Sequence, residues 1–428
     1  MLPEDKILID ETFAEGKMYL DKHHHPDFGI FPSADPLSNY FNQVWARDAA
    51  HATAHYFARA KPEAVIDSLR TFFNHQREDG AFPSRVERQY QMLRLTPGLR
   101  RLSSPLFHVI EHRFKKRTER PVHEDRDSAG GEDTVPALLI MAGELFSASQ
   151  EKDQHTIREF IQEHFEKLKK AVAFFRTTKT DPADGLAVMT HANPDWADTI
   201  MRKGKLGVIN IWWWRGLRYM EAMAKEFGED AAAKSYRKES EKVKKGIMEK
   251  LYDAPGGFFR AEAGPDANAD RLDTVASIFG AAYFLNADEA LQVERTLKRR
   301  VQRGSGLQNF DPPYPQKDIY WAHRLMGQWL YHNKFVWPWV TLQNIHVKIK
   351  IGREHENEAV RREYQREAVE DLIKMTYLFK EAGGAYEVFE PDEPRRGETI
   401  FYKPPQYFMG SMAAYQGAYA RLKSLGWI

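Results

Sequence analysis

The sequence contains no cysteine among its 428 residues, which excludes disulfide bonds, thiol nucleophiles and cysteine metal sites together. It also lacks a charge excess, because 62 Lys and Arg stand against 61 Asp and Glu, for a formal net charge of +1. A balanced charge gives no indication of nucleic acid or a membrane as a partner. No apolar run approaches the roughly 20 residues of a membrane span, and the N-terminus lacks the apolar stretch of a signal peptide. We therefore expect a soluble, cytoplasmic protein.

Strand-like alternation of apolar and polar residues is scarce, whereas helical spacing of apolar residues runs through most of the chain. In the segment 63–76, for example, Val65, Leu69 and Phe72 share one helical face. Gly and Pro pairs separate many of these segments. The expected helices cover residues 9–23, 49–60, 63–76, 133–146, 155–176, 208–225, 230–251, 272–285, 287–300, 337–349, 354–380 and 406–422.

About a dozen helices in consecutive antiparallel pairs predict an all-α fold, in which helical hairpins close into an (α/α)6 barrel. We expect a single domain over residues 1–428. An α-solenoid and two stacked bundles are the alternatives, but the sequence shows no self-similarity at a period of roughly 34 to 47 residues. An Arg-rich insertion at about 89–131 interrupts the pattern. We expect it to cover a cleft or to pack on a second subunit, which leaves a homo-oligomer open.

Polar, aromatic and Gly/Pro-rich residues concentrate in four loops, at 38–48, 191–204, 331–338 and 383–405, and each loop leads into an expected helix. In a ring of hairpins every second loop opens at the same end, so we expect these loops to converge on one funnel. Aromatic rings hold the apolar faces of a sugar, while Arg and Asp can each bind two vicinal hydroxyls. The first loop therefore predicts a small carbohydrate substrate.

Hydrolysis of a glycosidic bond requires one protonated carboxyl group and one carboxylate. Asp198 is the candidate acid, because Trp196 lies two residues before it and aromatic burial raises the pKa of a carboxyl. Asp195 competes with it for this role. Such carboxylates are also common as helix caps and ion-pair partners, and Arg47 with Asp48 allows the same interpretation, with Asp48 as an N-cap.

Glu387 is the candidate base, because Tyr386 and Phe389 flank it, and Glu390 is the alternative. Two carboxyl groups and a bound water supply this chemistry, so we expect no metal and no cofactor. Three adjacent histidines at 23–25 are a weak indication of a metal site. Neighbouring side chains on a helix point apart, so we expect them in a solvated loop and not at a metal.

The stretch Tyr40-Phe-Asn-Gln-Val-Trp-Ala-Arg-Asp48 resembles the Asn-Tyr-Asp-Gln-Val-Phe-(Val/Ile)-Arg-Asp motif of the neutral/alkaline invertases of glycoside hydrolase family 100. Three further motifs follow in one order. Residues 196–218 are similar to the Met-Ile-Asp-Arg-Arg loop and its helix, 331–338 to Tyr-His-Asn-Gly-Gly-Ser-Trp-Pro, and 385–390 to Trp-Pro-Glu-Tyr-Tyr-Asp. Glucoamylases and trehalases, which share a six-hairpin fold, are similar more distantly.

This resemblance implies an (α/α)6 barrel and hydrolysis with inversion, with Asp198 as acid, Glu387 as base, and Arg47 and Asp48 holding the terminal glucosyl ring. It also adds Asp133, whose Glu-Asp-Thr resembles the family's Val-Asp-Ser-Gly. The expected substrate-binding residues are Tyr40, Gln43, Trp45, Arg47, Asp48, Asp133, Trp196, Arg202, His332, Asn333, Trp337 and Tyr386.

The expected activity is an exo-acting glycosidase that releases α-glucose from a small glycoside, with sucrose as the lead substrate. Trehalose, glucosylglycerate and short α-glucans are alternatives, because Lys334-Phe-Val stands where the family has Gly-Gly-Ser. Two hypotheses from other classes stay open. A sugar isomerase or epimerase would use facing histidines, for which His191 and His332 are available. A non-catalytic sugar-binding protein would tolerate the loss of Asp198.

Overall fold

The structure, a computed structural model, describes residues 2–35, 38, 42–88, 119–123, 131–148, 154–191, 194–265, 267–325, 327–399 and 402–428. The expected Arg-rich insertion lies almost entirely outside these residues. None of the helices in the described ranges combines the length and the apolar composition needed to cross a bilayer.

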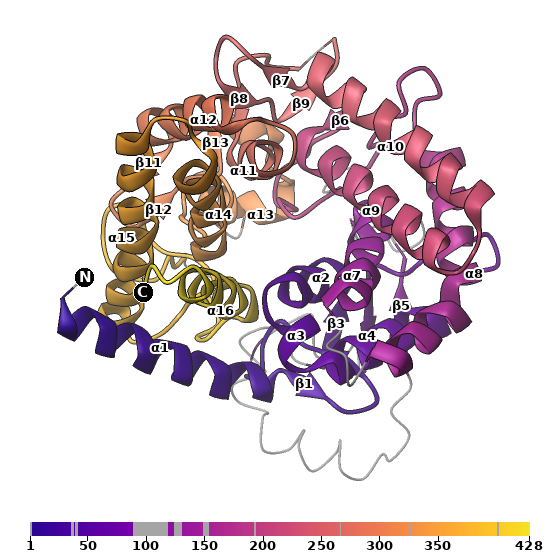
Figure 1. Ribbon diagram of the computed structural model, residues 1–428, viewed down its shortest axis with the longest axis horizontal. Helices are drawn as coiled ribbons and strands as arrows, with labels where there is room; N and C mark the ends of the chain where they lie inside the picture. The colour runs from indigo at the N-terminus through magenta and orange to yellow at the C-terminus, as the bar shows by residue number, and fades with distance from the viewer. Residues whose placement is uncertain are drawn as a thin grey trace.

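Within the described residues, six inner helices form a closed ring, and an outer helix flanks each of them (Figure 1). Each inner helix contacts the next one along the chain, and the last contacts the first. The inner helices are α2 (Ala46–Ala52), α7 (Thr134–Ala148), α9 (Gly207–Glu226), α11 (Thr274–Tyr283), α14 (Pro338–Glu354) and α16 (Met409–Ser424). The outer helices are α1 (Pro3–Lys22), α4 (Pro62–Asn74), α8 (Gln154–Lys179), α10 (Asp230–Lys250), α12 (Ala287–Arg300) and α15 (Glu358–Ala382). The predicted all-α (α/α)6 barrel is confirmed.

Sequence chemistry explains both layers. Helix α7 is apolar on every side, and its residues 134–145 are buried without interruption, as an inner helix requires. Outer helix α12 begins with a capping box, in which Asn286 accepts from the Glu289 amide at 3.0 Å and Glu289 accepts from the Asn286 amide at 2.9 Å. Outer helix α15 ends at Gly383, whose φ of 78° is the left-handed conformation that glycine adopts without strain.

The remaining elements are short. Helix α2 continues through a π-helix, η1 (Thr53–Phe57), into α3 (Ala58–Ala60), and η3 (Gln316–Asp318), α13 (Trp321–Leu325) and η4 (Gln328–Leu330) precede α14. The three-stranded antiparallel sheet has the order β3 (Gln43–Trp45), β4 (Arg85–Glu87), β5 (Arg120–Val122), with Val44 opposite Val86 and Val86 opposite Pro121. The two-stranded antiparallel pairs are β1 (His24–His25) with β2 (Gly29–Ile30), β6 (Lys205–Leu206) with β9 (Glu262–Ala263), β7 (Tyr252–Asp253) with β8 (Phe258–Phe259), β10 (Leu272–Asp273) with β13 (Phe310–Asp311), and β11 (Gln302–Arg303) with β12 (Gly306–Leu307).

The expectation of a solvated histidine loop is wrong for His23. Its side chain is buried, and its ring nitrogens lie 2.8 Å from the Phe31 carbonyl oxygen and 3.2 Å from the Tyr407 carbonyl oxygen. His24 bonds to Asp67 at 2.9 Å. These contacts link the end of α1 to the loop before α16, so the cluster joins the two ends of the chain.

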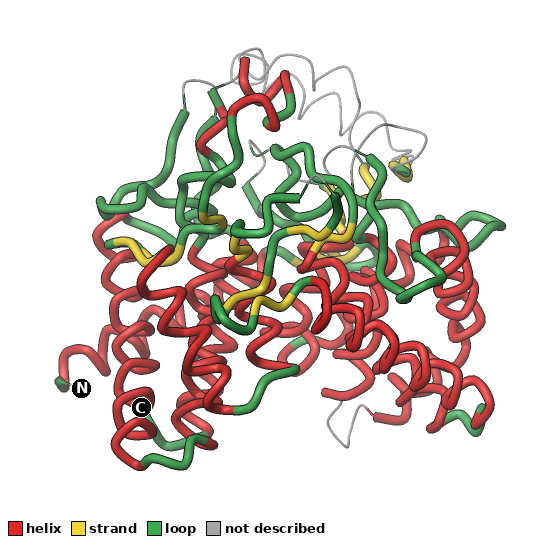
Figure 2. The backbone as a smooth tube through the Cα atoms, turned by 90° about the horizontal axis from the view of Figure 1, so that it is seen from above, coloured by secondary structure: helices red, strands yellow, loops and turns green. Residues whose placement is uncertain are grey.

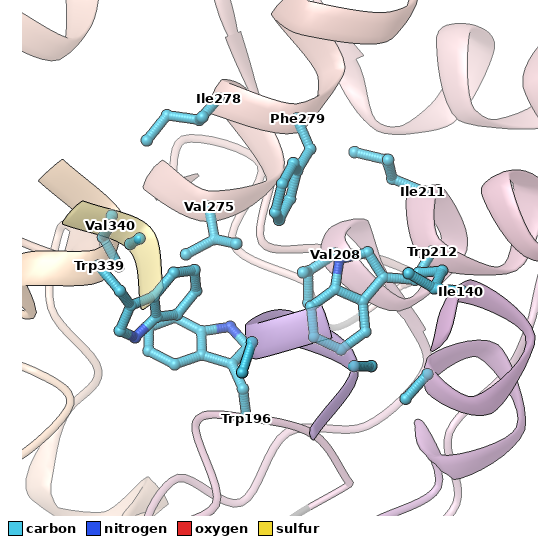
Figure 3. Close-up of a cluster of buried hydrophobic side chains, with 14 of the residues drawn as sticks. Ile140, Trp196, Val208, Ile211, Trp212, Val275, Ile278, Phe279, Trp339 and Val340 are labelled. Atoms are coloured by element: carbon cyan, nitrogen blue, oxygen red, sulfur yellow. The ribbon is translucent and has the colours of Figure 1, made fainter. Parts of the chain in front are cut away.

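A buried apolar cluster crosses the middle of the ring (Figure 3). On one side Trp196 and Trp339 meet edge to face, with ring centroids 5.2 Å apart. On the other side Trp212 and Phe279 meet edge to face, with ring centroids 6.3 Å apart. Val275 lies between the two pairs in the same view.

Candidate active site

The candidate active site lies at the end of the ring where the inner helices begin. The loop 42–45 leads into α2, 194–206 into α9, 331–337 into α14, and 383–399 with 402–408 into α16. Contacts of Arg47 with Asp198, Thr199 with His332 and Val336 with Phe389 join these loops, so the four predicted loops converge. Figure 2 shows the loops and short strands gathered on one side of the helices. The parallel N-termini of the inner helices carry partial positive charge, which favours carboxylates at this end.

Arg47, in the first turn of α2, connects two of the predicted carboxylates. Its Nη1 donates to Asp133 Oδ2 at 3.2 Å, and its Nη2 lies 3.6 Å from Asp198 Oδ2. The Asp133 side chain is buried, whereas 41% of the Asp198 side chain is exposed. Asp198 is therefore the member of this trio that is open to a ligand.

Burial raises the pKa of Asp198, and the charges of Arg47 and His323 oppose the rise. The outer part of the carboxyl group reaches solvent, but the surrounding loops remove enough water to favour the protonated form. A raised pKa keeps a proton on the carboxyl closer to neutral pH, which is what a general acid needs.

Asp48 stands in a similar environment. Burial raises its pKa to about 6, Arg47 opposes the rise, and Asp198 adds to it. The N-cap of α2 is Trp45, which makes no side-chain cap bond. The interpretation of Asp48 as an N-cap is therefore wrong, although its carboxyl group does accept a hydrogen bond from its own backbone amide in the first turn of α2.

Asp195, the competing candidate acid, is held inside the protein. Its carboxylate forms an ion pair with Arg202 and accepts from the Ala197 amide at 3.1 Å. Arg202 also reaches Asp273 at 3.2 Å, and its guanidinium carbon lies 4.8 Å from the centre of the Phe310 ring. The Arg202 side chain has 0% exposure and that of Asp195 1%. Both residues therefore stabilise the loop 194–206, and we do not place Arg202 among the residues that contact the substrate.

An aromatic wall lies beside Asp198. The ring of His332 stacks on Trp337 at 4.9 Å, and Trp196 meets both rings edge to face, at 5.3 and 5.7 Å. Thr199 Oγ1 and His332 Nδ1 are 2.8 Å apart, which ties the wall to the residue after Asp198. Burial, aided by nearby cations, lowers the pKa of His332 well below its usual value, so its imidazole is neutral.

Asn333 differs from its neighbours in this loop. Its Oδ1 accepts from the Tyr314 amide at 2.9 Å, and its Nδ2 donates to the Tyr314 carbonyl at 2.8 Å. Both ends of the side-chain amide are therefore used within the protein. We assign Asn333 to loop support, not to substrate contact.

Glu387, the candidate base, is almost fully buried, with 2% of the residue exposed. Its loop is anchored on both sides, because Val336 and Phe389 exchange main-chain hydrogen bonds at 3.0 and 2.9 Å and Phe408 donates to Ala385 at 2.8 Å. The Tyr402 hydroxyl donates a short hydrogen bond to Glu387 Oε2.

Ring contacts connect Glu387 to the aromatic wall. Tyr402, which holds Glu387, meets Tyr331 edge to face at 4.9 Å, and Tyr331 meets Trp337 at 5.0 Å. Trp337 in turn contacts His332, which is bonded to the residue after Asp198. A continuous set of contacting side chains thus runs from Glu387 to Thr199, the residue after Asp198.

The other predicted side chains lie around this core. On β3, Trp45 Nε1 donates to the buried Gln43 at 2.9 Å, and Arg85 lies 4.6 Å above the Trp45 ring. The Tyr386 ring is covered by Arg396 at 5.4 Å. Tyr40 lies outside the described residues. Among the described residues, no group of three or more His, Asp or Glu side chains has an arrangement that could hold a metal ion.

Sequence reasoning missed Thr199, His323, Tyr331 and Tyr402. Tyr331 is the first residue of a quoted motif, and Thr199 follows the candidate acid, so both had a positional signal. Tyr402 and His323 had none, because only the folded chain brings them beside Glu387 and Asp198.

The fold and the matches to known proteins are those of a glycoside hydrolase of the six-hairpin class. The chain belongs to the amylo-alpha-1,6-glucosidase family, whose sequence model matches residues 42–400. No curated protein sequence matches it.

Solved structures share the fold at low identity. The mannosylglycerate hydrolase of glycoside hydrolase family 63 from Thermus thermophilus, in complex with glucose, is 15% identical with a TM-score of 0.60, over 94% of this chain and 98% of that chain. A bacterial glucoamylase complexed with acarbose is 13% identical with a TM-score of 0.63, over 96% of this chain and 55% of that one. A rhamnosidase from Klebsiella oxytoca is 14% identical with a TM-score of 0.61, over 96% and 63%. The six-hairpin part of the predicted family relationship is thereby established.

Proposed function

We propose that this protein is an inverting, exo-acting glycoside hydrolase that releases a terminal glucosyl unit from a small α-glucoside. One observation carries the proposal. Asp198 is a partly exposed carboxyl with a raised pKa, and Glu387 is a buried carboxyl that accepts a hydrogen bond from Tyr402. Both lie beside the aromatic wall at the loop end of the ring.

Asp198 serves as the general acid. Its proton passes to the glycosidic oxygen as the bond from that oxygen to the anomeric carbon breaks, so the leaving group departs as a neutral alcohol. Arg47 lies 3.6 Å from Asp198 and stabilises the carboxylate that remains. Asp133 holds Arg47 in place from its buried side.

Glu387 serves as the general base. It accepts a proton from a water molecule, whose oxygen bonds to the anomeric carbon on the face opposite the leaving group, and this inverts the configuration. The hydrogen bond from Tyr402 fixes the carboxylate that receives the proton. An inverting pair leaves room for the sugar and the water, which corresponds to roughly 6.5 to 9.5 Å between the carboxyl groups.

The terminal ring is held by groups at the start of α2 and by the aromatic wall. Arg47 and Asp48 suit a pair of vicinal hydroxyls, because each presents two hydrogen-bonding atoms in a plane. Trp196 and Trp337 offer apolar ring surface for the faces of the pyranose.

For the leaving group, the family description favours an α-1,6-glucosidic bond, and the similarity to a mannosylglycerate hydrolase supports a small acidic aglycone as the second choice. Sucrose, the lead substrate from the invertase resemblance, has no support from these comparisons. We therefore place isomaltose and glucosylglycerate ahead of sucrose.

Product analysis tests the proposal. The purified protein is incubated with isomaltose, glucosylglycerate, sucrose, trehalose, maltose and short α-glucans, and the products are separated by anion-exchange chromatography, with Asp198→Asn as the control. Release of free glucose by the wild type and not by the variant is expected. Absence of release from every substrate would contradict the proposal.

The isomerase alternative would show as conversion of a free monosaccharide without a second product. Its histidines have separate partners, because His191 bonds to Glu132 at 3.0 Å and His332 bonds to Thr199 at 2.8 Å. The sugar-binding alternative would show as binding of a glucoside with no turnover by wild type or variant.

A further inference from the structure

A cavity of about 620 Å³ occupies the other end of the ring's interior. Its walls come from the inner helices and from η1, and its rim includes Arg59 and Arg421, near the C-terminal ends of α3 and α16. Its volume is in the range of small-molecule sites, which is roughly 300 to 1,000 Å³. The proposed hydrolysis uses none of the rim residues.

The cavity is distinct from the candidate active site. Trp212 and Phe279, from one side of the apolar cluster of Figure 3, line it, whereas Trp196 and Trp339, from the other side, do not. Only Arg47, of the residues that we place at the hydrolytic site, contributes to its lining. The cavity therefore borders one side of the apolar cluster, and Arg47 is the residue that it shares with the candidate active site.

The rim carries positive charge without matching carboxylates. Arg59 and Arg421 are exposed, and within the described part of the chain neither forms an ion pair. Arg59 makes one long hydrogen bond, of 3.4 Å, to the Ala54 carbonyl oxygen. The carboxylate in the lining, Glu144, is already paired with Arg215.

Besides apolar side chains, Arg47 and the Glu144–Arg215 ion pair, the cavity is lined by polar groups that carry no charge. Burial lowers the pKa of His51 and of His346 to about 4, and that of His55 well below its usual value, so the three imidazoles are neutral. Gln416 is 2% exposed and donates from Nε2 to the Phe13 carbonyl at 2.8 Å. Its Oε1 is buried without a hydrogen-bond partner in the described residues. Neutral donors and acceptors of this kind suit hydroxyl groups.

The wall that carries His55 is a π-helix, η1 (Thr53–Phe57), in the middle of an otherwise α-helical inner element. Single-turn π-helices are rare and occur frequently at functional sites. His51, in α2, and His55, in η1, are four residues apart and lie side by side in the lining, with ring centroids 4.7 Å apart.

We propose that this cavity binds a phosphorylated sugar. Arg59 and Arg421 face the phosphoryl group at the rim, the neutral histidines and Gln416 face the hydroxyls, and Trp212, Phe279 and Tyr283 supply apolar ring surface for the pyranose.

A purely structural role for the two rim arginines makes a different prediction. Cations near helix C-termini are favoured by the helix dipole, and on that account Arg59 and Arg421 would affect stability alone. Ligand binding is therefore the measurement that separates the two roles.

The experiment is isothermal titration calorimetry of the full chain with glucose 6-phosphate, glucose and inorganic phosphate. The double variant Arg59→Gln with Arg421→Gln is compared with Arg362→Gln with Arg366→Gln, two arginines that are 77% and 69% exposed on outer helix α15. We expect glucose 6-phosphate to bind the wild type and the α15 variant equally. We expect binding at least tenfold weaker to the rim variant, and at least tenfold weaker for glucose or phosphate alone.

Three results would overturn the inference. They are no binding of glucose 6-phosphate to the wild type, equal binding of glucose 6-phosphate to the rim variant, and inorganic phosphate binding as tightly as the phosphorylated sugar. These outcomes are independent of turnover, so the proposed hydrolysis can fail without affecting them.

Discussion

The two ends of the same six inner helices carry opposite chemistry. At the loop end, where the helices begin, Asp48, Asp133 and Asp198 gather around one arginine. At the other end, Arg59 and Arg421 lie in the cavity lining and form no ion pair within the described residues, and Glu144 in the same lining is paired with Arg215. Parallel helix dipoles favour anions at the first end and cations at the second. A reaction that needs two carboxyls belongs at the end where the inner helices start.

Burial acts on both ends in the same direction, toward neutral side chains. It raises the pKa of Asp48 and Asp198 at the loop end, and it lowers the pKa of His51 and His346 at the cavity end. The consequences differ. A neutral carboxyl has a proton to give, which suits the first end to catalysis. A neutral imidazole with a pKa of about 4 is a weak base that near neutral pH mainly exchanges hydrogen bonds, which suits the second end to binding.

Removing the candidate base gives the largest expected loss of kcat, and it should distinguish the catalytic end from the cavity end most clearly. Glu387→Gln should lower kcat by at least about 10³-fold, because no other carboxylate replaces it in activating water. Steady-state kinetics measures this, with circular dichroism to show that the fold is kept. The rim change Arg59→Gln with Arg421→Gln should leave kcat within about threefold. Wild-type rates from Glu387→Gln would remove the base assignment.

Asp198→Asn should lower kcat by about 10²- to 10⁴-fold, since the leaving group then departs without a proton. A glucoside with a good leaving group, such as 4-nitrophenyl α-glucoside, needs less protonation and should recover part of the rate. The ratio of the two substrates is the measurement. An equal loss on both substrates would argue against general-acid catalysis by this residue.

Asp195→Asn should reduce stability, by about 3 kcal/mol, because it leaves the buried Arg202 without its nearest carboxylate. Urea unfolding gives the free energy, and Asp198→Asn is the matched control, expected within about 0.5 kcal/mol of wild type because its side chain is 41% exposed. If Asp195→Asn kept full stability and lost all activity, the assignment of the two aspartates would be reversed.

Asp48→Asn tests the burial of a carboxyl at the loop end. Its folded-state pKa of about 6 lies above the ordinary 3.8, so the folded chain holds this proton more tightly than the unfolded chain does. Stability contributed by this group is present below about pH 4 and is lost as the pH rises to about 6. The unfolding free energy of the variant should therefore rise relative to that of the wild type across this window, by about 3 kcal/mol at pH 7. A pH-independent difference in unfolding free energy would contradict this.

Tyr402→Phe gives the smallest expected effect. Loss of one hydrogen bond to a charged group is worth about 1.5 kcal/mol, so kcat should fall about tenfold with KM little changed. Tyr407→Phe, which removes a hydroxyl bonded to Glu15 at 2.9 Å on the outer layer, is the control and should keep wild-type kinetics. A large rise in KM alone would place Tyr402 in substrate binding and not in positioning the base.

Local sequence patterns were enough to predict the helices and their pairing, because 3.6-residue periodicity survives in both layers. They also predicted the convergence of the loops, since hairpin connectivity alone decides which loops share an end. They did not reveal that Arg202 and Asn333 are used inside the protein, because that depends on Asp195, Asp273 and Tyr314, which reach them only in the folded chain. The cavity was also hidden, since its lining is drawn from helices across the whole chain.

The anomeric configuration of the first product tests the account most directly. Proton NMR spectra recorded within minutes of adding the wild-type enzyme to an α-glucoside resolve the two anomers of glucose before they interconvert. If Asp198 and Glu387 act as the acid and base of an inverting pair, the initial product from an α-glucoside is β-glucose. Initial release of α-glucose would contradict the assignment of Asp198 and Glu387 as the acid and base of an inverting pair.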